Sequence, residues 1–362
     1  MLHEYEAMAR ERLSAPVWDF LEGGSGTESM LSAGREALDR ITLRPRCLVD
    51  VSHRDPRTTL LGAALAAPLG IAPMAYHQLA HPEGEVATAR AAGEAGALFT
   101  VSMFASRSLE DIAAAASGPL WLQLYWLRSR EQLAVLARRA EAAGYQALVL
   151  TVDAPRVAHR PRDARNGFGI PPDIRAVNVD PAMMTASHGH RPGESAIARH
   201  SKEQFDSSIT WEDLAWLREQ TSLPLVLKGV LTAEDSECAV KYGVDGIIVS
   251  NHGGRQLDFA RAAPDCLPEI AEAASGRCAI ILDGGIRHGA DIAKALCLGA
   301  DAVFVGRPVL WGLAHSGSDG TAGVLRLLMD EFDEVMALMG APTPRDFTPS
   351  GISRSVIPGM HF

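Results

Sequence analysis

Short apolar runs alternate with alanine-rich helical patterns along most of this chain. From about residue 67 onward, each run rich in Val, Ile and Leu leads into a polar or glycine-bearing turn and then into a segment with helical periodicity. The pattern predicts strands at Leu69–Met74, Leu98–Met103, Leu120–Tyr125, Ala147–Asp153, Leu223–Val230, Gly246–Ser250, Ala279–Asp283 and Ala302–Gly306. It predicts helices between them at Glu85–Ala95, Leu109–Ala116, Arg130–Ala143, Trp211–Gln220, Ala233–Tyr242, Leu267–Ala274 and Ala290–Leu298.

The architecture follows from the burial that these runs require. They lack the alternation of half-exposed strands, so we expect both faces of each strand to be covered, as in a parallel sheet with helical crossovers. Eight such repeats favour a closed (β/α)8 TIM barrel in the α/β class over an open doubly wound sheet. The open sheet remains the alternative, although no G-x-G-x-x-G motif follows the first run. A length of 362 residues suits one barrel with insertions, and two medium domains are also open.

Two segments fall outside the repeat. Residues 1–60 are expected to form an N-terminal helical cap, in which Val17–Leu21 leads into a turn at residues 23–26. Residues 161–208, after the fourth predicted strand, are rich in Pro, Gly, His and Arg, and we expect a long lid loop without regular structure over the strand ends. The chain is thus interpreted as a single domain over residues 1–362, with a cap at 1–60, a barrel at 61–340 and a C-terminal tail at 341–362.

Composition narrows the class of protein. Hydrophobic residues at 47% and charged residues at 22% describe a globular chain with a sizeable core, which excludes disorder, collagen and coiled coil. The net charge of -10 disfavours a nucleic-acid partner. Five cysteines without a C-x-x-C pair suggest neither a disulfide framework nor a zinc knuckle and fit the cytoplasm. Neither a signal peptide at Met1–Leu13 nor a membrane segment is expected.

Polar residues gather where the predicted strands end, which is where a barrel builds its active site. The first five strands with polar ends carry Pro73, Met74 and Ala75, then Ser102, then Gln123 and Tyr125, then Thr151 and Asp153, then Lys228. Taken singly, each has a plain structural interpretation, because a lysine or glutamine at a strand end is often only a solvated side chain. Their coincidence at one edge is what favours a site.

The last two strand ends indicate a phosphate site. Asp283-Gly284-Gly285-Ile286-Arg287 and Gly306-Arg307 combine glycines with arginines. Glycines let the backbone approach a ligand closely, and loops at this place in the fold commonly bind phosphate. Arginines add charge-assisted hydrogen bonds to phosphate oxygens. We therefore expect a phosphorylated cofactor, with a simple tight turn as the alternative for the first string.

The string SNHGGRQLD, residues 250–258, points to proton transfer. His252 offers a proton acceptor near neutral pH, and Arg255 places a fixed cation beside it. This pairing suits removal of a proton from an anionic substrate. A structural role is the alternative for a histidine considered by itself.

At this point the chain resembles the FMN-dependent 2-hydroxy acid oxidases and dehydrogenases, which include glycolate oxidase, lactate oxidase and mandelate dehydrogenase. SNHGGRQLD is close to the signature of that family, and the similarity runs from residue 16 to VGRP near residue 305 through APMAYHQLAHPEGE, LQLY, TVDAPR, LVLKGV and LDGGIR. Within the family, DFLEGGSGTE, AYHQLAHPEGE and LQLYWLR are most similar to the 4-hydroxymandelate oxidases.

The resemblance implies a reaction and its residues. The reaction is FMN-dependent oxidation of an (S)-2-hydroxy acid, 4-hydroxymandelate or mandelate, to the 2-keto acid, with oxygen as acceptor and hydrogen peroxide as product. His252 is similar to the active-site base, and Asp153 to the carboxylate that orients it. The substrate carboxylate corresponds to Arg160 and Arg255, and the substrate hydroxyl or carboxylate to Tyr125. Lys228 stands where the family places a cation near flavin N1 and O2.

The remaining cofactor contacts are also carried over by resemblance. The ring contacts correspond to Met74, Ala75, Ser102, Gln123 and Thr151, and the ribityl and phosphate contacts to Ser250, Asp283, Gly284, Gly285, Arg287, Gly306 and Arg307. One departure stands out, because many members have a tyrosine where this chain has Phe20. Phe20 and Phe104 are expected as walls for an aromatic substrate, and plain packing is the alternative for both.

Several alternatives remain open. The same fold and cofactor could serve aliphatic substrates such as lactate or glycolate, or could form a non-catalytic FMN-binding scaffold, or a barrel for a phosphorylated metabolite without flavin. The lid is polar, with His188, His190, Arg191 and His200, which favours a soluble oxidase over a membrane-bound dehydrogenase. No third ligand accompanies the H-x-H pair, so no metal is expected. By analogy with the family, the chain is expected to form a homotetramer.

Overall fold

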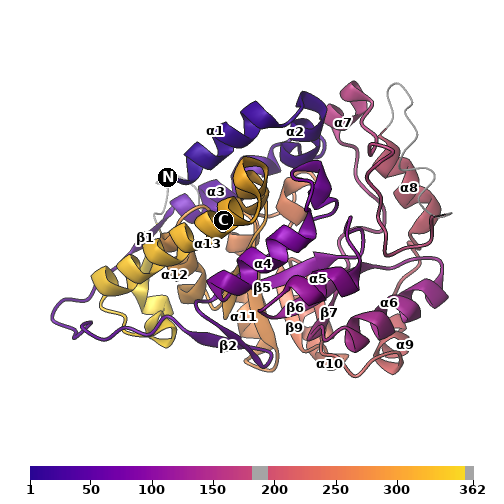
Figure 1. Ribbon diagram of the computed structural model, residues 1–362. Helices are drawn as coiled ribbons and strands as arrows, with labels where there is room; N and C mark the ends of the chain where they lie inside the picture. Colours follow the sequence, from indigo (N-terminus) through magenta and orange to yellow (C-terminus); the bar gives the residue numbers. More distant parts are fainter. Residues whose placement is uncertain (182–194, 355–362) are drawn as a thin grey trace.

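Eight parallel strands close into a barrel in the computed structural model, which describes residues 1–181 and 195–354 (Figure 1). The strands are β4 (Leu69–Ile71), β5 (Leu98–Ser102), β6 (Leu120–Tyr125), β7 (Ala147–Thr151), β8 (Leu225–Val230), β9 (Gly246–Val249), β10 (Ala279–Asp283) and β11 (Ala302–Val305). Because β11 pairs with β4, the sheet has no free edge. The predicted (β/α)8 barrel is therefore confirmed, and the open sheet is wrong.

Helices cover the outside of the barrel. Seven of those named below lie where the periodicity predicts a helix, and the last, over residues 307–339, was not predicted. They are α4 (Glu85–Ala95), α5 (Leu109–Ala115), α6 (Arg130–Ala142), α9 (Asp213–Glu219), α10 (Ala233–Lys241), α11 (Ala263–Ala274), α12 (Gly289–Cys297) and α13 (Arg307–Met339). Helix α11 begins four residues before the predicted Leu267, since Pro264 lies in its first turn, where a missing N–H costs nothing. Helix α13 is kinked, because Ser316 and Gly317 have non-helical backbone angles.

The inside of the barrel is filled by large side chains, so the barrel is not a pore. Trp121 and Phe304 are fully buried and meet edge to face at 5.7 Å. Gly70 makes room for this pair, because a Cβ there would lie 2.5 Å from the Phe304 ring. Because the interior is filled, a ligand has to bind outside it, and the cavity described below lies at the carboxyl ends of the strands.

The N-terminal cap consists of α1 (Leu2–Arg12), α2 (Ala15–Glu22) and α3 (Met30–Asp39), as predicted. Helix α1 packs along α13, and α2 lies against α7 (Pro161–Asn166) (Figure 1). Four short strands were not predicted. Two form the hairpin β2 (Thr58–Leu60) and β3 (Ala63–Leu65), and β1 (Ile41–Leu43) pairs with β12 (Ile352–Arg354), which joins the cap to the C-terminal segment.

The expectation that residues 161–208 lack regular structure is wrong for the part that the structure describes. This segment contains α7 and α8 (Ala196–Gln204), and Leu127 bridges Phe205 beyond α8. His188, His190 and Arg191 lie outside the described residues. Within the described ranges, no helix is both long and apolar enough to cross a membrane.

Candidate active site

A cavity with about 1290 Å³ of empty space, including its mouth, opens at the carboxyl ends of the barrel strands. Most of the predicted site residues line it, namely Phe20, Met74, Ala75, Phe104, Gln123, Tyr125, Thr151, Arg160, Lys228, His252, Arg255, Asp283, Gly284, Gly285, Arg287, Gly306 and Arg307. Ser102, Asp153 and Ser250 lie behind the lining, where they contact residues that do line it. The structure therefore brings together, from all along the chain, the residues that the motifs singled out.

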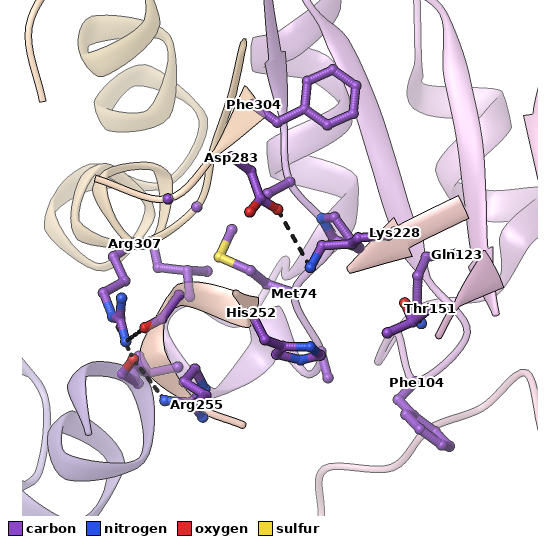
Figure 2. A pocket seen from close by; sticks show the side chains of 18 of the residues that line it. Met74, Phe104, Gln123, Thr151, Lys228, His252, Arg255, Asp283, Phe304 and Arg307 are labelled. Carbon is purple, nitrogen blue, oxygen red and sulfur yellow. Dashed lines mark hydrogen bonds and ion pairs between the residues drawn. The ribbon is translucent and has the colours of Figure 1, made fainter. Parts of the chain in front are cut away.

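His252 lines this cavity (Figure 2), and Asp153 contacts it from behind the lining to form a dyad. The Nδ1 atom of His252 lies 2.8 Å from Asp153 Oδ1. Because an ionised carboxylate only accepts hydrogen bonds, Nδ1 carries the proton, and the lone pair on Nε2 is available. That Nε2 atom lies 3.4 Å from the Tyr125 hydroxyl. Gly229 makes room for the dyad, since a Cβ there would come within 2.5 Å of the Asp153 side chain.

The environment keeps the dyad in the charge state that a base requires. Burial lowers the pKa of His252 below 6.5, and this outweighs the Asp153 carboxylate, which raises the pKa. Burial acts to raise the pKa of Asp153, but the electrostatic interaction and hydrogen bond with His252 and the charge of Lys228 lower it overall. At neutral pH the imidazole is therefore neutral and the carboxylate is ionised.

Two arginines, one buried and one half-buried, stand beside the dyad. Arg160 is only 6% exposed, and Arg255 donates a hydrogen bond of 2.6 Å to the carbonyl of Gly23. Burial lowers the pKa of both guanidinium groups, and the positive charges of Arg160 and Arg307 lower that of Arg255 further. Buried cations that repel one another bind an anion favourably, so this end of the cavity suits a carboxylate ligand.

Phe20 packs against neighbouring residues and also lines the cavity. Its ring stacks on Phe168 at 4.5 Å between centroids, and the Arg255 guanidinium carbon lies 5.4 Å from the Phe20 centroid. The same ring lines the cavity. Phe20 is therefore packed in the core of the cap and is also a wall of the site.

A second aromatic wall faces the cavity from the barrel and the lid. Tyr125 stacks on Phe205 at 4.7 Å and on Phe104 at 5.7 Å. Burial raises the pKa of Tyr125, so its hydroxyl stays protonated and can donate a hydrogen bond. The wall thus combines flat apolar surface with one hydrogen-bond donor next to His252.

Lys228 supplies a buried positive charge at the end of β8. Its ammonium group donates a hydrogen bond of 3.0 Å to Ser250 Oγ and lies 3.4 Å from a carboxylate oxygen of Asp283 (Figure 2). Burial acts to lower the pKa of Lys228, but Asp283 and Asp153 raise it overall. Lys228 is therefore charged at neutral pH and can stabilise negative charge on a ligand.

Three polar side chains on adjacent strands form a ladder. Ser102 Oγ donates to Gln123 Oε1 at 3.1 Å, and Gln123 Nε2 donates to Thr151 Oγ1 at 2.9 Å. These two bonds fix which end of the Gln123 amide faces each neighbour. The ladder presents a rigid polar edge to the cavity.

The glycine loops form an anion cradle. Gly284 and Gly285 have φ angles of +91° and +81°, which favour glycine. A Cβ on Gly306 would come no nearer than 3.5 Å to another residue of the chain, the Met74 Sδ atom, so the backbone at Gly306 is open. Burial and the nearby charge of Arg307 together lower the pKa of Arg287 to about 10. Close backbone and two guanidinium groups are what a phosphate group needs.

The residues present fit FMN, the cofactor that the resemblance implies. Asp283 Oδ1 and Asn251 Nδ2 are buried and have no hydrogen-bond partner within residues 1–181 and 195–354. They lie on the side of the glycine loops, where the hydroxyls of a polyol chain would satisfy them. Together with the ladder, the Lys228 charge and the anion cradle, they match a long polar ligand with a phosphate at one end.

Sequence reasoning missed residues that only the assembled fold brings to the site. Arg35 on α3 donates to the Gly285 carbonyl at 3.0 Å and to Asp291 Oδ1 at 2.7 Å, and Asp291 accepts the Arg287 backbone N–H at 2.8 Å. Arg35 thus supports the glycine loop from the cap. Phe205 and other lid residues line the cavity as well, and no motif marks them.

Known proteins resemble this chain over nearly its whole length. A family model described as FMN-dependent dehydrogenase matches residues 9–354. The chain is 48% identical over 339 residues to a 4-hydroxymandelate oxidase from Amycolatopsis orientalis, covering 94% of each chain. It is 47% identical over 353 residues to an L-lactate oxidase from a Nostoc species, covering 96% of each. A crystal structure of mandelate oxidase with (S)-4-hydroxymandelic acid matches with a TM-score of 0.94 at 45% identity, over 98% of this chain and 99% of that one.

Proposed function

The chain belongs to the FMN-dependent dehydrogenase family, and from this premise we propose that it oxidises (S)-4-hydroxymandelate or (S)-mandelate to the 2-keto acid. The observation that carries the choice of substrate is the aromatic wall. Phe104, Tyr125 and Phe205 stack beside His252 and offer flat apolar surface to an aryl side chain. The mandelate oxidase structure that contains (S)-4-hydroxymandelic acid supports the same choice.

The proposed reaction assigns one task to each group around the dyad. Arg160 and Arg255 bind the substrate carboxylate, and Tyr125 donates a hydrogen bond to the substrate hydroxyl or carboxylate. His252 Nε2 accepts the proton that the substrate loses, and Asp153 stabilises the imidazolium that results. When bound, FMN supplies the acceptor for two electrons. Lys228 holds positive charge where the reduced cofactor gains negative charge.

The proposed cofactor site follows the geometry of the cavity. We expect the ring to be held by the polar ladder, by Lys228 and by the backbone after β4, and the polyol and phosphate by the loops after β9, β10 and β11. The residues in these roles are Met74, Ala75, Ser102, Gln123, Thr151, Lys228, Ser250, Asp283, Gly284, Gly285, Arg287, Gly306 and Arg307.

The pH dependence of kcat/KM tests the role of His252. Only the neutral imidazole accepts a proton, so kcat/KM should fall as the pH drops through the pKa of His252. Burial lowers that pKa, Asp153 acts to raise it, and Lys228 and Arg160 lower it, so the acid limb should lie below 6.5. Steady-state rates with (S)-mandelate between about pH 4.5 and 8 measure it. The Asp153→Asn variant should move the limb to lower pH, and a wild-type limb above 6.5 would contradict the assignment.

An anaerobic titration tests the proposed function. The holoenzyme is mixed with (S)-4-hydroxymandelate, (S)-mandelate and (S)-lactate, flavin absorbance is followed, and the sample is then reopened to air. Rapid bleaching by the aromatic acids is expected, because an apolar wall discriminates by burial of the side chain. A protein that binds FMN but bleaches with no 2-hydroxy acid would be a scaffold, and a colourless protein that binds only a phosphorylated metabolite would refute flavin chemistry.

An aliphatic substrate is the second candidate function. The similarity to the L-lactate oxidase, at 47% identity over 96% of both chains, favours it. Bleaching by (S)-lactate alone would establish this candidate and would reduce Phe20 and Phe104 to packing residues. Comparable kcat/KM values for lactate and mandelate would mean that neither Phe20 nor the aromatic wall selects between the two substrates.

We further propose that oxygen is the electron acceptor, with hydrogen peroxide as product, and that the protein is a cytoplasmic homotetramer. The oxidase relatives support the first point. All five cysteines are free thiols, which fits a reducing compartment. The tetramer rests on analogy with the family. Slow recolouring when the titrated sample meets air would point to a different acceptor.

A further inference from the structure

A carboxylate stands beside the arginines of the anion cradle, and the mechanism proposed above gives it no task. Glu22 is the last residue of α2, and only 15% of its side chain is exposed. Its Oε2 atom lies 3.6 Å from Nε of Arg307, the residue at which α13 begins. A negative charge next to a phosphate site opposes the ligand, so its presence there needs a physical reason.

Trp311 fixes the position of this carboxylate. Its indole Nε1–H donates a hydrogen bond of 2.7 Å to Glu22 Oε1, and Trp311 is only 2% exposed. Trp311 lies four residues after Arg307 on α13, so the two side chains share one face of the helix. The guanidinium carbon of Arg287 lies 4.9 Å from the centroid of the same indole. One indole therefore ties Glu22 and Arg287 to the start of α13.

Backbone carbonyl groups, and not the carboxylate, orient the Arg307 guanidinium group. Its Nε atom donates to the Leu21 carbonyl at 3.2 Å, and Nη2 donates to the Gly253 carbonyl at 3.0 Å. The Glu22 carbonyl is a third acceptor, at 3.5 Å from Nη2. These acceptors belong to the main chain and remain when the Glu22 side chain is changed. At 3.6 Å, the Glu22 carboxylate therefore adds charge rather than orientation.

The charge matters because the cradle brings cations together. Both Arg287 and Arg307 are half-buried, and like charges at such positions repel one another more strongly than in water. Burial and the charge of Arg307 lower the pKa of Arg287, and Glu22 and Glu6 act to raise it. Among residues 1–181 and 195–354, Glu22 is the only carboxylate within 4 Å of Arg307. Glu22 thus offsets a repulsion that is built into the cradle.

We propose that Glu22 is a built-in counter-anion of the cradle, which stabilises the flavin-free protein and lowers its affinity for the phosphate group of FMN. This inference rests on the proposed cofactor site and is independent of the substrate. In the flavin-free protein, Glu22 offsets the charges of Arg287 and Arg307. A bound phosphate group faces the same two cations and is repelled by the carboxylate, so the net affinity for FMN is smaller.

Glu22→Gln tests both parts of this inference, because the amide keeps an acceptor for the Trp311 N–H and removes the charge. Flavin is removed from the full-length protein, and Kd is measured for FMN and for riboflavin, which lacks the phosphate group. Kd for FMN should fall by about 3- to 30-fold in the variant, whereas Kd for riboflavin should change by less than about twofold. The flavin-free variant should unfold about 2 °C or more below flavin-free wild type. A substitution that only loosened the cap would weaken FMN binding instead of strengthening it.

A matched control and a second variant separate the possible outcomes. Glu11→Gln removes the same charge from an exposed position of α1 and should match wild type in each measurement. Arg307→Met should weaken FMN binding by at least about tenfold and leave riboflavin binding within about twofold. If Arg307→Met does not weaken FMN binding selectively, the proposed cofactor site itself fails. If it does, the inference is overturned when Glu22→Gln has a Kd for FMN no lower than wild type or an unchanged unfolding temperature without flavin.

The rate at which FMN leaves the loaded protein replaces Kd if the flavin-free Glu22→Gln protein does not stay folded. That rate should be lower in Glu22→Gln than in wild type, because differences in affinity between related complexes lie mostly in the dissociation rate. A rate equal to or above that of wild type overturns the inference.

Discussion

Replacing His252 with alanine should lower kcat by about 10²- to 10⁴-fold, the range that a positioned general base contributes. The imidazole is the group whose Nε2 lone pair faces the cavity, because its Nδ1 atom is held by Asp153 at 2.8 Å. The methyl group of alanine cannot accept a proton. The neighbouring guanidinium groups are cationic donors and cannot replace the imidazole as a base.

Flavin binding should survive this substitution. The phosphate cradle lies on other loops, and the Lys228 ammonium group keeps its contact with Ser250 at 3.0 Å. The measurement is therefore paired, with flavin content from the absorption spectrum and kcat from steady-state oxidation of (S)-mandelate. His53→Ala, at an exposed histidine outside the cavity, serves as the matched control and should match wild type. A flavin-loaded His252→Ala protein with wild-type turnover would refute the assigned base.

Replacing Glu85 with leucine should destabilise the protein by about 3–5 kcal/mol, because a buried polar network loses its acceptor. The Glu85 side chain is fully buried. Its Oε1 atom accepts the backbone N–H groups of His77 and Ser106, both at 2.9 Å, and Oε2 accepts the Ser106 hydroxyl at 2.7 Å. Leucine leaves these three donors without a partner in the interior.

The isosteric variant makes this prediction specific. Glu85→Gln keeps an oxygen for the two N–H groups, and its amide can donate to Ser106 Oγ. The free energy of unfolding should therefore fall by only about 1 kcal/mol. Thermal unfolding at a fixed FMN concentration compares the variants with Glu83→Gln, an exposed neighbour that should be neutral. If Glu85→Leu and Glu85→Gln lower the free energy of unfolding by the same amount, the hydrogen bonds of Glu85 do not account for its contribution to stability.

The Glu85 network also explains why a residue outside the cavity matters for the site. Glu85 lies on α4, whereas its donors belong to η1 (His77–Leu79) after β4 and to the loop after β5. The same two loops carry Tyr76 and Phe104 into the cavity. Loss of the carboxylate should therefore loosen the aromatic wall as well as the fold.

The site residues that belong to motifs could be placed from the sequence, because each motif is a short local string. Asp283 ends a buried strand, and the residues up to Arg287, like Gly306 and Arg307, directly follow one. Strand order in a barrel places consecutive strand ends side by side. Helix boundaries at glycines were predictable for the same reason. The supporting contact from Arg35 to Asp291 was not, since 256 positions separate the two residues and neither belongs to a motif.

The lid shows where sequence reasoning reached its limit. Proline, glycine and charged residues hide the periodicity of α7 and α8, so the segment was expected to be irregular. The described part instead packs His200 and Phe205 against Phe104. Their role in the wall depends on contacts with β-strand ends far away in the chain.

By itself the sequence determined the barrel, the order of its strands and the family. Apolar periodicity and motif spacing are local properties of the sequence, and the need to bury apolar residues gives each element its place in the fold. The tertiary structure alone decided which nitrogen of His252 faces the cavity, because that depends on the 2.8 Å contact with Asp153. It also decided the charge states of the buried groups and the composition of the aromatic wall. Each of these depends on desolvation and on distances between residues that are remote in the chain, and no local pattern encodes them.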